Sequence, residues 1–305
     1  MLLSTPRRFF KAAAAGLLLA ASAATVAQDF SKTEIKAEKL NETTWMLVGA
    51  GGNMGLSVGE DAVFLIDDQY APLAPKIKAA IAAITSKPVK FVLNTHFHFD
   101  HTGGNEALGK EGALIVAHDN VRRRLSADQL ISVVGSSSRQ AASPKVALPI
   151  ITVPGAISFH INGEEVHAFH VAAAHTDGDL IVHFKGGDIV HMGDVFFNGS
   201  YPFIDAGSGG SPLGMIAAFD RVLALAGEKT RIIPGHGPLA DKAALQRTRD
   251  MLATLVGRIQ AERRAGKSDE QIRAAQPTAD FDAVWGKGFI KPEQFVQLVL
   301  NGLPK

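Results

Sequence analysis

The sequence contains no cysteine among its 305 residues. No thiolate is therefore available as a nucleophile or a metal ligand, and any bound metal must be held by His, Asp, Glu or the backbone. The protein also needs no oxidative folding. Neither sign of charge is in excess, with a formal net charge of +1, and the sequence has no basic stripe. The composition therefore gives no indication of a nucleic-acid partner.

Long hydrophobic runs are absent beyond residue 27. Before that point, Arg7, Arg8 and Lys11 precede an apolar, alanine-rich run from Ala12 to about Ala27. This order is typical of a cleaved secretory signal, and the run is short and weakly hydrophobic for the alternative, a membrane anchor. We therefore expect an exported, periplasmic protein without stable membrane association after cleavage. The pair of arginines before two phenylalanines also resembles a twin-arginine signal, so both the Sec and the twin-arginine routes stay open.

The export hypothesis makes a direct prediction about the mature protein. Small residues at Thr25-Val26-Ala27 precede the polar Gln28, so cleavage there is expected to give a chain that begins near Gln28. N-terminal sequencing of periplasmic material tests this. An intact Met1 on the purified native protein would contradict it.

The rest of the chain, residues 28–305, has the composition and length of one large globular domain with a hydrophobic core. Apolar runs predict strands and helical spacing predicts helices, in an order of strands then helix that occurs twice. This order fits two β-sheets packed face to face with helices outside. A helical region is expected from about 240 to 305. Predicted strands are 44–48, 62–67, 89–93, 113–117, 180–184, 188–192 and 231–233; predicted helices are 73–85, 121–125 and 213–225.

Two connecting segments have features of their own. Asn162-Gly163 lies between two alternating runs and predicts a β-hairpin. Residues 126–148 have weak periodicity around Gly135, and we interpret them as a mobile loop or short helix near the mouth of the site.

The segment that carries chemistry follows the strand 89–93 and contains His96, His98, Asp100 and His101. Three imidazoles and a carboxylate within six residues are costly to bury unless a cation coordinates them. The glycine-rich stretch 102–105 closes the loop. The spacing therefore favours a metal site over a solvated turn or a hydrogen-bonded histidine cluster.

Further ligands must come from other strand ends. His175, Asp194 and His236 each stand among small residues after an apolar run, and small neighbours let the backbone approach a crowded centre.

The motif order of HxHxDH, then His, Asp and Gly-His-Gly resembles that of the metallo-β-lactamase superfamily, over about residues 40–240. The resemblance implies an α/β fold, a four-layer αββα sandwich, with two zinc ions at one edge between the sheets. It implies that His96, His98 and His175 bind the first zinc, that Asp100, His101 and His236 bind the second, and that Asp194 bridges both. It also implies that Asp67 orients a ligand histidine from behind, whereas the alternative for Asp67 is a simple turn acid.

The remaining histidines are expected to be packing or surface residues, except His118, whose position after a strand leaves a site role open. The histidines expected to be packing or surface residues are His160, His167, His170, His183 and His191.

The expected chemistry follows from the ligand types. Neutral imidazoles leave the zinc charge to act on a bound water, whose pKa falls to about 7. A hydroxide shared by two zinc ions would then attack a carbonyl carbon, and Asp100 could accept a hydrogen bond from it and orient it. No Ser or Cys nucleophile is required.

We expect a small-molecule substrate, and the residue at position 194 indicates which class of substrate it is. The resemblance places a cysteine there in one group of true β-lactamases, followed by a lysine that holds the substrate carboxylate, and this chain has neither. A bridging Asp is instead found in hydroxyacylglutathione hydrolases, lactonases and phosphodiesterases, but no basic glutathione site is evident here. We expect β-lactamase-like hydrolysis of a cyclic amide or ester, with the loop 196–211, including Asn198 and Tyr201, facing the substrate.

Three alternatives stay open. One is a thioesterase or lactonase of the hydroxyacylglutathione-hydrolase type, and another is an oxidoreductase that binds a single iron and oxidises persulfides. His98 argues against the diiron oxygen reductases, which resemble this loop but have Glu there. A binding protein that has lost the chemistry is disfavoured by the complete ligand set.

Overall fold

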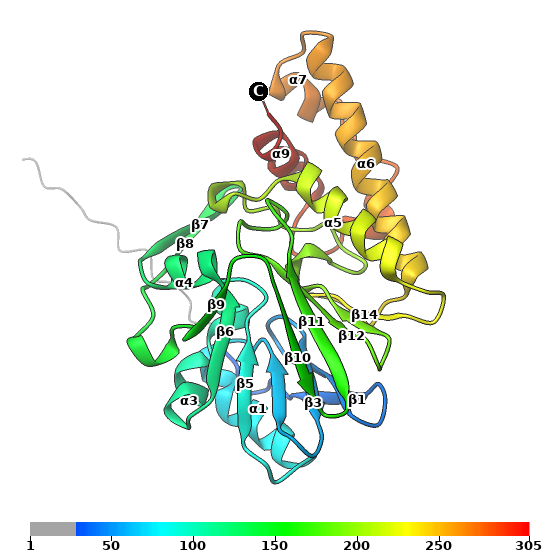
Figure 1. Cartoon of the computed structure of the whole chain (residues 1–305). Coiled ribbons are helices and arrows are strands. Elements are labelled where there is room, and N and C mark those ends of the chain that lie inside the picture. Colours follow the sequence, from blue (N-terminus) through cyan, green and yellow to red (C-terminus); the bar gives the residue numbers. More distant parts are fainter. Residues whose placement is uncertain (1–28, 305) are drawn as a thin grey trace, which may run out of the picture.

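The fold consists of two β-sheets packed face to face, with helices on their outer faces (Figure 1). The computed structural model describes residues 29–304. The predicted signal, residues 1–27, lies outside the described residues. The layers form the predicted αββα sandwich.

The first sheet has seven strands in the order β1-β2-β3-β4-β5-β6-β9. β1 to β4 are antiparallel neighbours, whereas β4, β5, β6 and β9 run parallel. The carboxyl ends of the parallel strands therefore share one edge of the sheet. The strands are β1 Lys36–Lys39, β2 Thr44–Val48, β3 Met54–Val58, β4 Val63–Ile66, β5 Val89–Leu93, β6 Leu114–His118 and β9 Ile151–Val153.

The second sheet has five strands in the order β10-β11-β12-β13-β14. All its neighbours are antiparallel except β13 and β14. The predicted hairpin joins β10 to β11, where Asn162 and Gly163 both have positive φ, as a tight two-residue turn requires. The strands are β10 Ala156–Ile161, β11 Glu164–His170, β12 Leu180–Phe184, β13 Ile189–His191 and β14 Arg231–Ile233.

Strand β4 shows why its sequence is apolar throughout. Val63 and Leu65 pack outward against the helix side of the sheet, whereas Phe64 and Ile66 pack inward against the second sheet. All four side chains are fully buried. A strand covered on both faces needs no polar alternation, so this run could be identified as a buried strand from its sequence.

The helices cover the two outer faces, and α6, α7 and α9 rise above the sheets at the carboxyl end of the chain (Figure 1). The helical region expected from about 240 is therefore confirmed. None of the described helices is long and apolar enough to cross a membrane. The longer helices are α1 Ala74–Ala82, α3 Asn105–Lys110, α4 Asp119–Leu125, α5 Pro212–Leu225, α6 Lys242–Arg264, α7 Asp269–Ala274 and α9 Pro292–Gly302; the four-residue helices are α2 Phe99–Thr102 and α8 Asp282–Trp285.

The prediction of a loop or short helix for residues 126–148 was wrong. Most of this segment is a hairpin of β7 Gln129–Val133 and β8 Ser136–Gln140, followed by a 3-10 turn at Lys145–Ala147. Among the described residues the two strands pair only with each other, and β8 is exposed at four of its five positions, so its sequence lacks the alternation of a strand packed on one face. Gly135, with φ of 86°, makes the turn between them.

Candidate metal centre

Loops at the ends of strands in both sheets converge on one centre. The segment with His96, His98, Asp100 and His101 follows β5, and His175 lies in the loop between β11 and β12. Asp194 follows β13 and His236 follows β14. The parallel pairs β4–β5 and β13–β14 direct these loops to the same edge of the sandwich. All seven predicted ligands are thus brought together.

Three imidazole nitrogens form the core of the first group. His98 Nδ1 lies 3.2 Å from His96 Nε2 and 3.0 Å from His175 Nε2. All three side chains are buried.

The outer hydrogen bonds of two of these rings fix where their protons sit. His98 Nε2 donates to Asp205 Oδ2 at 3.0 Å, and His175 Nδ1 donates to the carbonyl of Phe203 at 2.8 Å. Each neutral ring carries one N–H, so the nitrogen that faces the centre has a bare lone pair.

Asp67 lies behind the ligand loop and orients the rings of His96 and His101. Thr95 Oγ1 donates to Asp67 Oδ2 at 2.8 Å and can accept from His96 Nδ1 at 3.1 Å. His101 Nδ1 donates to the same carboxylate oxygen at 2.8 Å. Asp67 has φ of 61°, a conformation that a non-glycine residue adopts at a cost of about 1–3 kcal/mol. The structure therefore places Asp67 in the supporting position that the resemblance implies.

Asp194 lies between two groups of ligands. Its Oδ2 is 3.7 Å from His175 Nε2 and 3.9 Å from His96 Nε2. Its Oδ1 is 3.0 Å from His101 Nε2 and 3.3 Å from His236 Nε2. One carboxylate thus offers one oxygen to each group, which is the arrangement of a bridging ligand.

The second group consists of Asp100, His101 and His236, whose ligand atoms all lie within 4.8 Å of one another. His101 Nε2 and Asp194 Oδ1 are buried and have no hydrogen-bond partner, although they are neighbours. When His101 is neutral, two facing acceptors repel each other, and a cation between them, either a proton or a metal ion, removes the repulsion. The donor set, with its converging lone pairs and orphaned buried atoms, fits metal binding.

The pKa shifts of histidines have opposite directions in the two ligand groups. Burial lowers the pKa of His96, and it lowers that of His175 to about 4. Burial opposes the charge of His236 too, but Asp194 and Asp100 outweigh it and raise its pKa to about 9. The same two carboxylates, together with Asp67, raise the pKa of His101 against the effect of burial. In the second group, protons therefore compete with a cation for the same nitrogens.

Two glycines allow the close approach of backbone to this centre. A Cβ on Gly52 would collide with the ring of His101, and one on Gly235 would collide with Asp194 Oδ1 and the backbone of Gly193. The small residues beside the ligands are therefore a steric requirement at these positions.

A cavity of about 490 Å³ opens beside the ligands, with His98, Asp100, Asp194 and His236 on its floor. This volume is in the range of small-molecule sites. Its walls come from the β7–β8 hairpin, from the loop 196–211 and from the carboxyl-terminal region. Apolar wall residues include Tyr70, Phe99, Ile131, Val133, Phe203 and Phe289.

The two predicted substrate contacts differ in position. The ring of Tyr201 lines the cavity, but its hydroxyl donates to Asp282 at 2.7 Å and is not free for a ligand. Asn198 does not line the cavity; its amide donates to the carbonyl of Pro238 and so ties this loop to the one that carries His236. Only Tyr201 therefore contributes a surface to the pocket.

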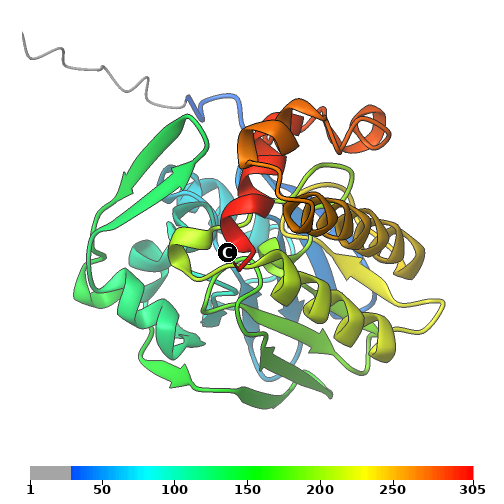
Figure 2. The same cartoon turned by 90° about the horizontal axis from the view of Figure 1, so that it is seen from above.

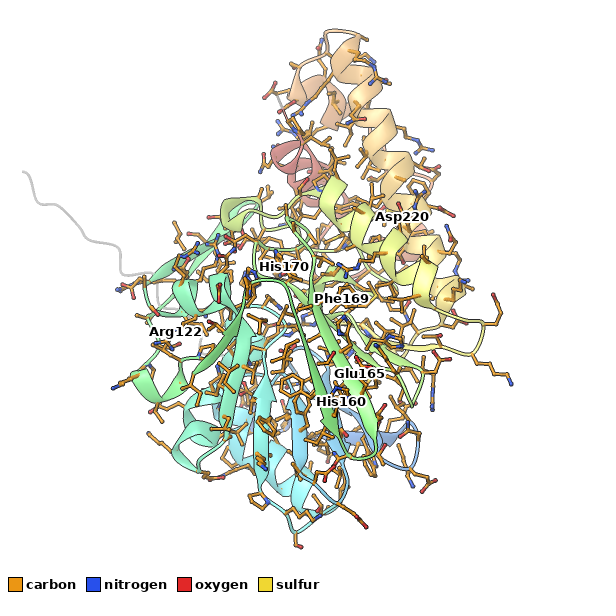
Figure 3. All side chains as sticks on the ribbon, in the orientation of Figure 1. Arg122, His160, Glu165, Phe169, His170 and Asp220 are labelled. Carbon is orange, nitrogen blue, oxygen red and sulfur yellow. The ribbon has the colours of Figure 1, made fainter. Side chains whose placement is uncertain are left out.

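The histidines outside the ligand set do not line the cavity. Figure 3 shows His160 near one end of the second sheet and His170 at the other. His170 stacks on His118 with ring centroids 3.9 Å apart, and neither ring lines the cavity. His191 is buried, and its Nε2 donates to the carbonyl of Asn53 at 3.0 Å.

Asp205 and Thr95, which hold His98 and His96, were not predicted from the sequence. Thr95 stands next to a ligand, a position that could have indicated a supporting role. Asp205 lies 107 residues from its histidine, in a loop without regular secondary structure. The only signal was that it is the one acidic residue in the segment 196–211.

Asp205 is expected to act as a positioning residue for His98. Replacing Asp205 with Ala should weaken metal binding about 10- to 100-fold, because the ring loses the partner that fixes its tautomer. Asp205→Asn keeps an acceptor oxygen and should lose less. Competition with a chromophoric chelator measures both. Equal metal affinities for Asp205→Ala and wild type would show that ring packing alone positions His98.

The sequence model of the metallo-beta-lactamase superfamily matches residues 41–236, and the chain belongs to this superfamily. Its fold is also that of a metallo-beta-lactamase from Pontibacter korlensis, with a TM-score of 0.57, 18% identity and coverage of 72% of this chain and 99% of that one. A double mutant of the sec-alkyl sulfatase PisA1 superimposes with a TM-score of 0.66 at 18% identity, over 87% of this chain and 49% of that one.

Curated relatives are similar at the level of sequence. The probable metallo-hydrolase YqgX of Bacillus subtilis is 29% identical over 192 residues, which cover 59% of this chain and 86% of that protein. A hydroxyacylglutathione hydrolase of Nitrosococcus oceani is 29% identical over 147 residues, or 48% of this chain and 47% of that enzyme. The match thus spans only about half of the latter.

Proposed function

We propose that the protein is a dinuclear zinc hydrolase that breaks the bond between the carbonyl carbon and the ring nitrogen or oxygen of a cyclic amide or ester. The observation that carries this proposal is the pair of ligand groups that share Asp194, each with nitrogen lone pairs directed inward. His96, His98 and His175 would hold one ion, and Asp100, His101 and His236 the other. Membership of a superfamily of metallo-hydrolases supports the reaction class.

Zinc bound there would supply a water of lowered pKa and polarise the substrate carbonyl. Asp100 is the ligand carboxylate most open to the cavity, with 16% of its side chain exposed against 5% for Asp194. It can accept a hydrogen bond from the attacking water and orient it. The water oxygen bonds to the carbonyl carbon, the ring C–N or C–O bond breaks, and the water's proton passes to the leaving nitrogen or oxygen.

Thioester hydrolysis is the second candidate, favoured by the relatives named hydroxyacylglutathione hydrolase. A panel of β-lactams, lactones, thioesters and phosphodiesters on zinc-loaded protein tests both candidates. Zinc-dependent hydrolysis of a cyclic amide or ester supports the first. If no substrate of the panel is hydrolysed and the purified protein contains one tightly bound iron, the iron oxidoreductase would replace both hydrolase candidates.

Penicillins are expected to be turned over weakly, and a high KM rather than a low kcat should be the main defect. Among the described residues, no lysine or arginine lines the cavity, so a substrate carboxylate has no cationic side chain to bind. Steady-state kinetics on several penicillins measure the two constants. KM values in the low micromolar range would show that a carboxylate clamp exists after all.

We further propose that the enzyme acts after export to the periplasm. The basis is the pattern of its first 27 residues, which is typical of a secretory signal.

A further inference from the structure

The cavity beside the ligands is closed on two sides by segments far apart in the sequence. The β7–β8 hairpin supplies Ile131 and Val133, and the segment before α9 supplies Phe289 and Ile290. Figure 2 shows the last helix (red) between this hairpin (green) and α6 (gold). Gln294 on α9 donates to the carbonyl of Val134, which ties the two walls together.

The walls are apolar, and their polar groups are few. Ser138 and Ser200 contribute hydroxyls, while the Tyr201 hydroxyl is engaged by Asp282. The Tyr201 ring also stacks on Phe295 of α9, with centroids 4.3 Å apart. The carboxyl-terminal helices thus shape the pocket itself, and not only the outer surface of the fold.

The cationic residues that lie close to wall residues in the sequence do not line the cavity. Arg139, next to Ser138 on β8, pairs with Asp128, and Lys291 Nζ donates to the carbonyl of Gly288. Lys287 is exposed and does not line the cavity. A charged tail that entered the pocket would lose its hydration without gaining an opposite charge on the walls.

We propose that this cavity selects uncharged substrates with an apolar tail, which lies between the hairpin and Phe289–Ile290 while the carbonyl sits over the ligands. This inference rests on the proposed function for the reaction, but the tail site is defined by the walls alone. Carboxylate-tailed and glutathione-like substrates are disfavoured, because their charge would find no cation among the described wall residues. Each methylene buried contributes about 0.8 kcal/mol at most, or up to about fourfold in kcat/KM.

The test uses γ-lactones with alkyl tails of increasing length, and a lactone of matched length whose tail ends in a carboxylate. We expect kcat/KM to rise about threefold per added methylene until the cavity is filled, consistent with burial of apolar surface. The carboxylate lactone should be at least about tenfold poorer than its neutral counterpart. A flat dependence on tail length in an active enzyme would overturn the proposal.

Two exposed residues give a matched pair of variants. Phe289 is 74% exposed and lines the cavity, whereas Leu130 is 68% exposed and does not. Phe289→Ser should flatten the dependence on tail length, and Leu130→Ser should leave it unchanged; equal behaviour of the two variants would contradict the assigned wall. Ser138→Lys should raise kcat/KM for the carboxylate lactone about tenfold. Preference of the wild type for that lactone, lost in Lys287→Ala, would overturn the proposal and locate an anion clamp at the mouth.

A binding experiment separates this inference from the proposed reaction. Calorimetry with 2-alkanones, which cannot be hydrolysed, should show affinity that rises with chain length and falls in Phe289→Ser. Such binding without hydrolysis of any lactone or lactam would remove the proposed function and leave the tail site. Hydrolysis without chain-length-dependent binding would remove the tail site and leave the function.

Discussion

Replacing Asp194 with Asn is expected to weaken the binding of one metal by about a hundredfold or more, since even outer contacts of metal ligands contribute 10- to 100-fold. The carboxylate offers Oδ1 to His101 and His236 and Oδ2 to His96 and His175. Asn keeps the shape but loses the charge that offsets repulsion between two cations. The second group should lose its ion first, because three imidazoles still hold the other.

Zinc stoichiometry and hydrolysis after dialysis against a weak chelator measure this effect. Asp220→Asn is a suitable control, because Asp220 lies on α5 and pairs with Arg249 at the surface (Figure 3). The control should keep the metal content and rate of the wild type. Two tightly held zinc ions and an unchanged rate in Asp194→Asn would remove Asp194 from the site.

The two metals are expected to respond differently to pH. In the metal-free protein His236 has a pKa of about 9, so below that value a metal must displace its proton, and affinity falls about tenfold per pH unit for each proton displaced. Asp194 and Asp100 raise the pKa of His101 in the same direction. His175, with a pKa of about 4, is already neutral between pH 6 and 8. Lowering the pH from 8 to 6 should therefore weaken the second metal by about a hundredfold or more, and should weaken the first by less.

Stepwise zinc affinities at pH 6, 7 and 8, from competition with a chelator of known pH dependence, give the two slopes. His236→Ala serves as the comparison. Removing this imidazole should reduce by about one the number of protons displaced by the more weakly bound zinc, and so the slope of its log affinity against pH. Equal slopes for both steps would show that the two ligand groups are not electrostatically distinct.

The ligands could be predicted because their signal is local. His96, His98, Asp100 and His101 stand within six residues directly after an apolar strand, and such a cluster is too costly to bury without a cation to coordinate it. His175, Asp194 and His236 each follow a recognisable apolar run with small neighbours. The face-to-face sheets were predicted from the succession of strands and helices, and apolar runs identified individual strands such as β4, with its four fully buried residues.

The pocket could be predicted only in part: residues 126–148 and 196–211 were expected beside the site and do line the cavity, but the rest of its walls depend on tertiary packing. The β7–β8 hairpin pairs only with itself within the described residues, so it lacks the alternation of a strand packed on a core. Phe289 reaches the cavity from a segment more than 180 residues after His101, and no local pattern encodes that contact. Asp205 is similar, since its partner His98 lies in another part of the chain.

The central claim is that one carboxylate joins two metals across the ends of both sheets. A crystal structure of the zinc-loaded protein, with anomalous data at the zinc edge, tests it most directly. We predict two anomalous peaks per chain, one among His96, His98 and His175 and one among Asp100, His101 and His236, with one oxygen of Asp194 directed at each. A single peak, or two peaks with Asp194 bound to neither, would contradict it.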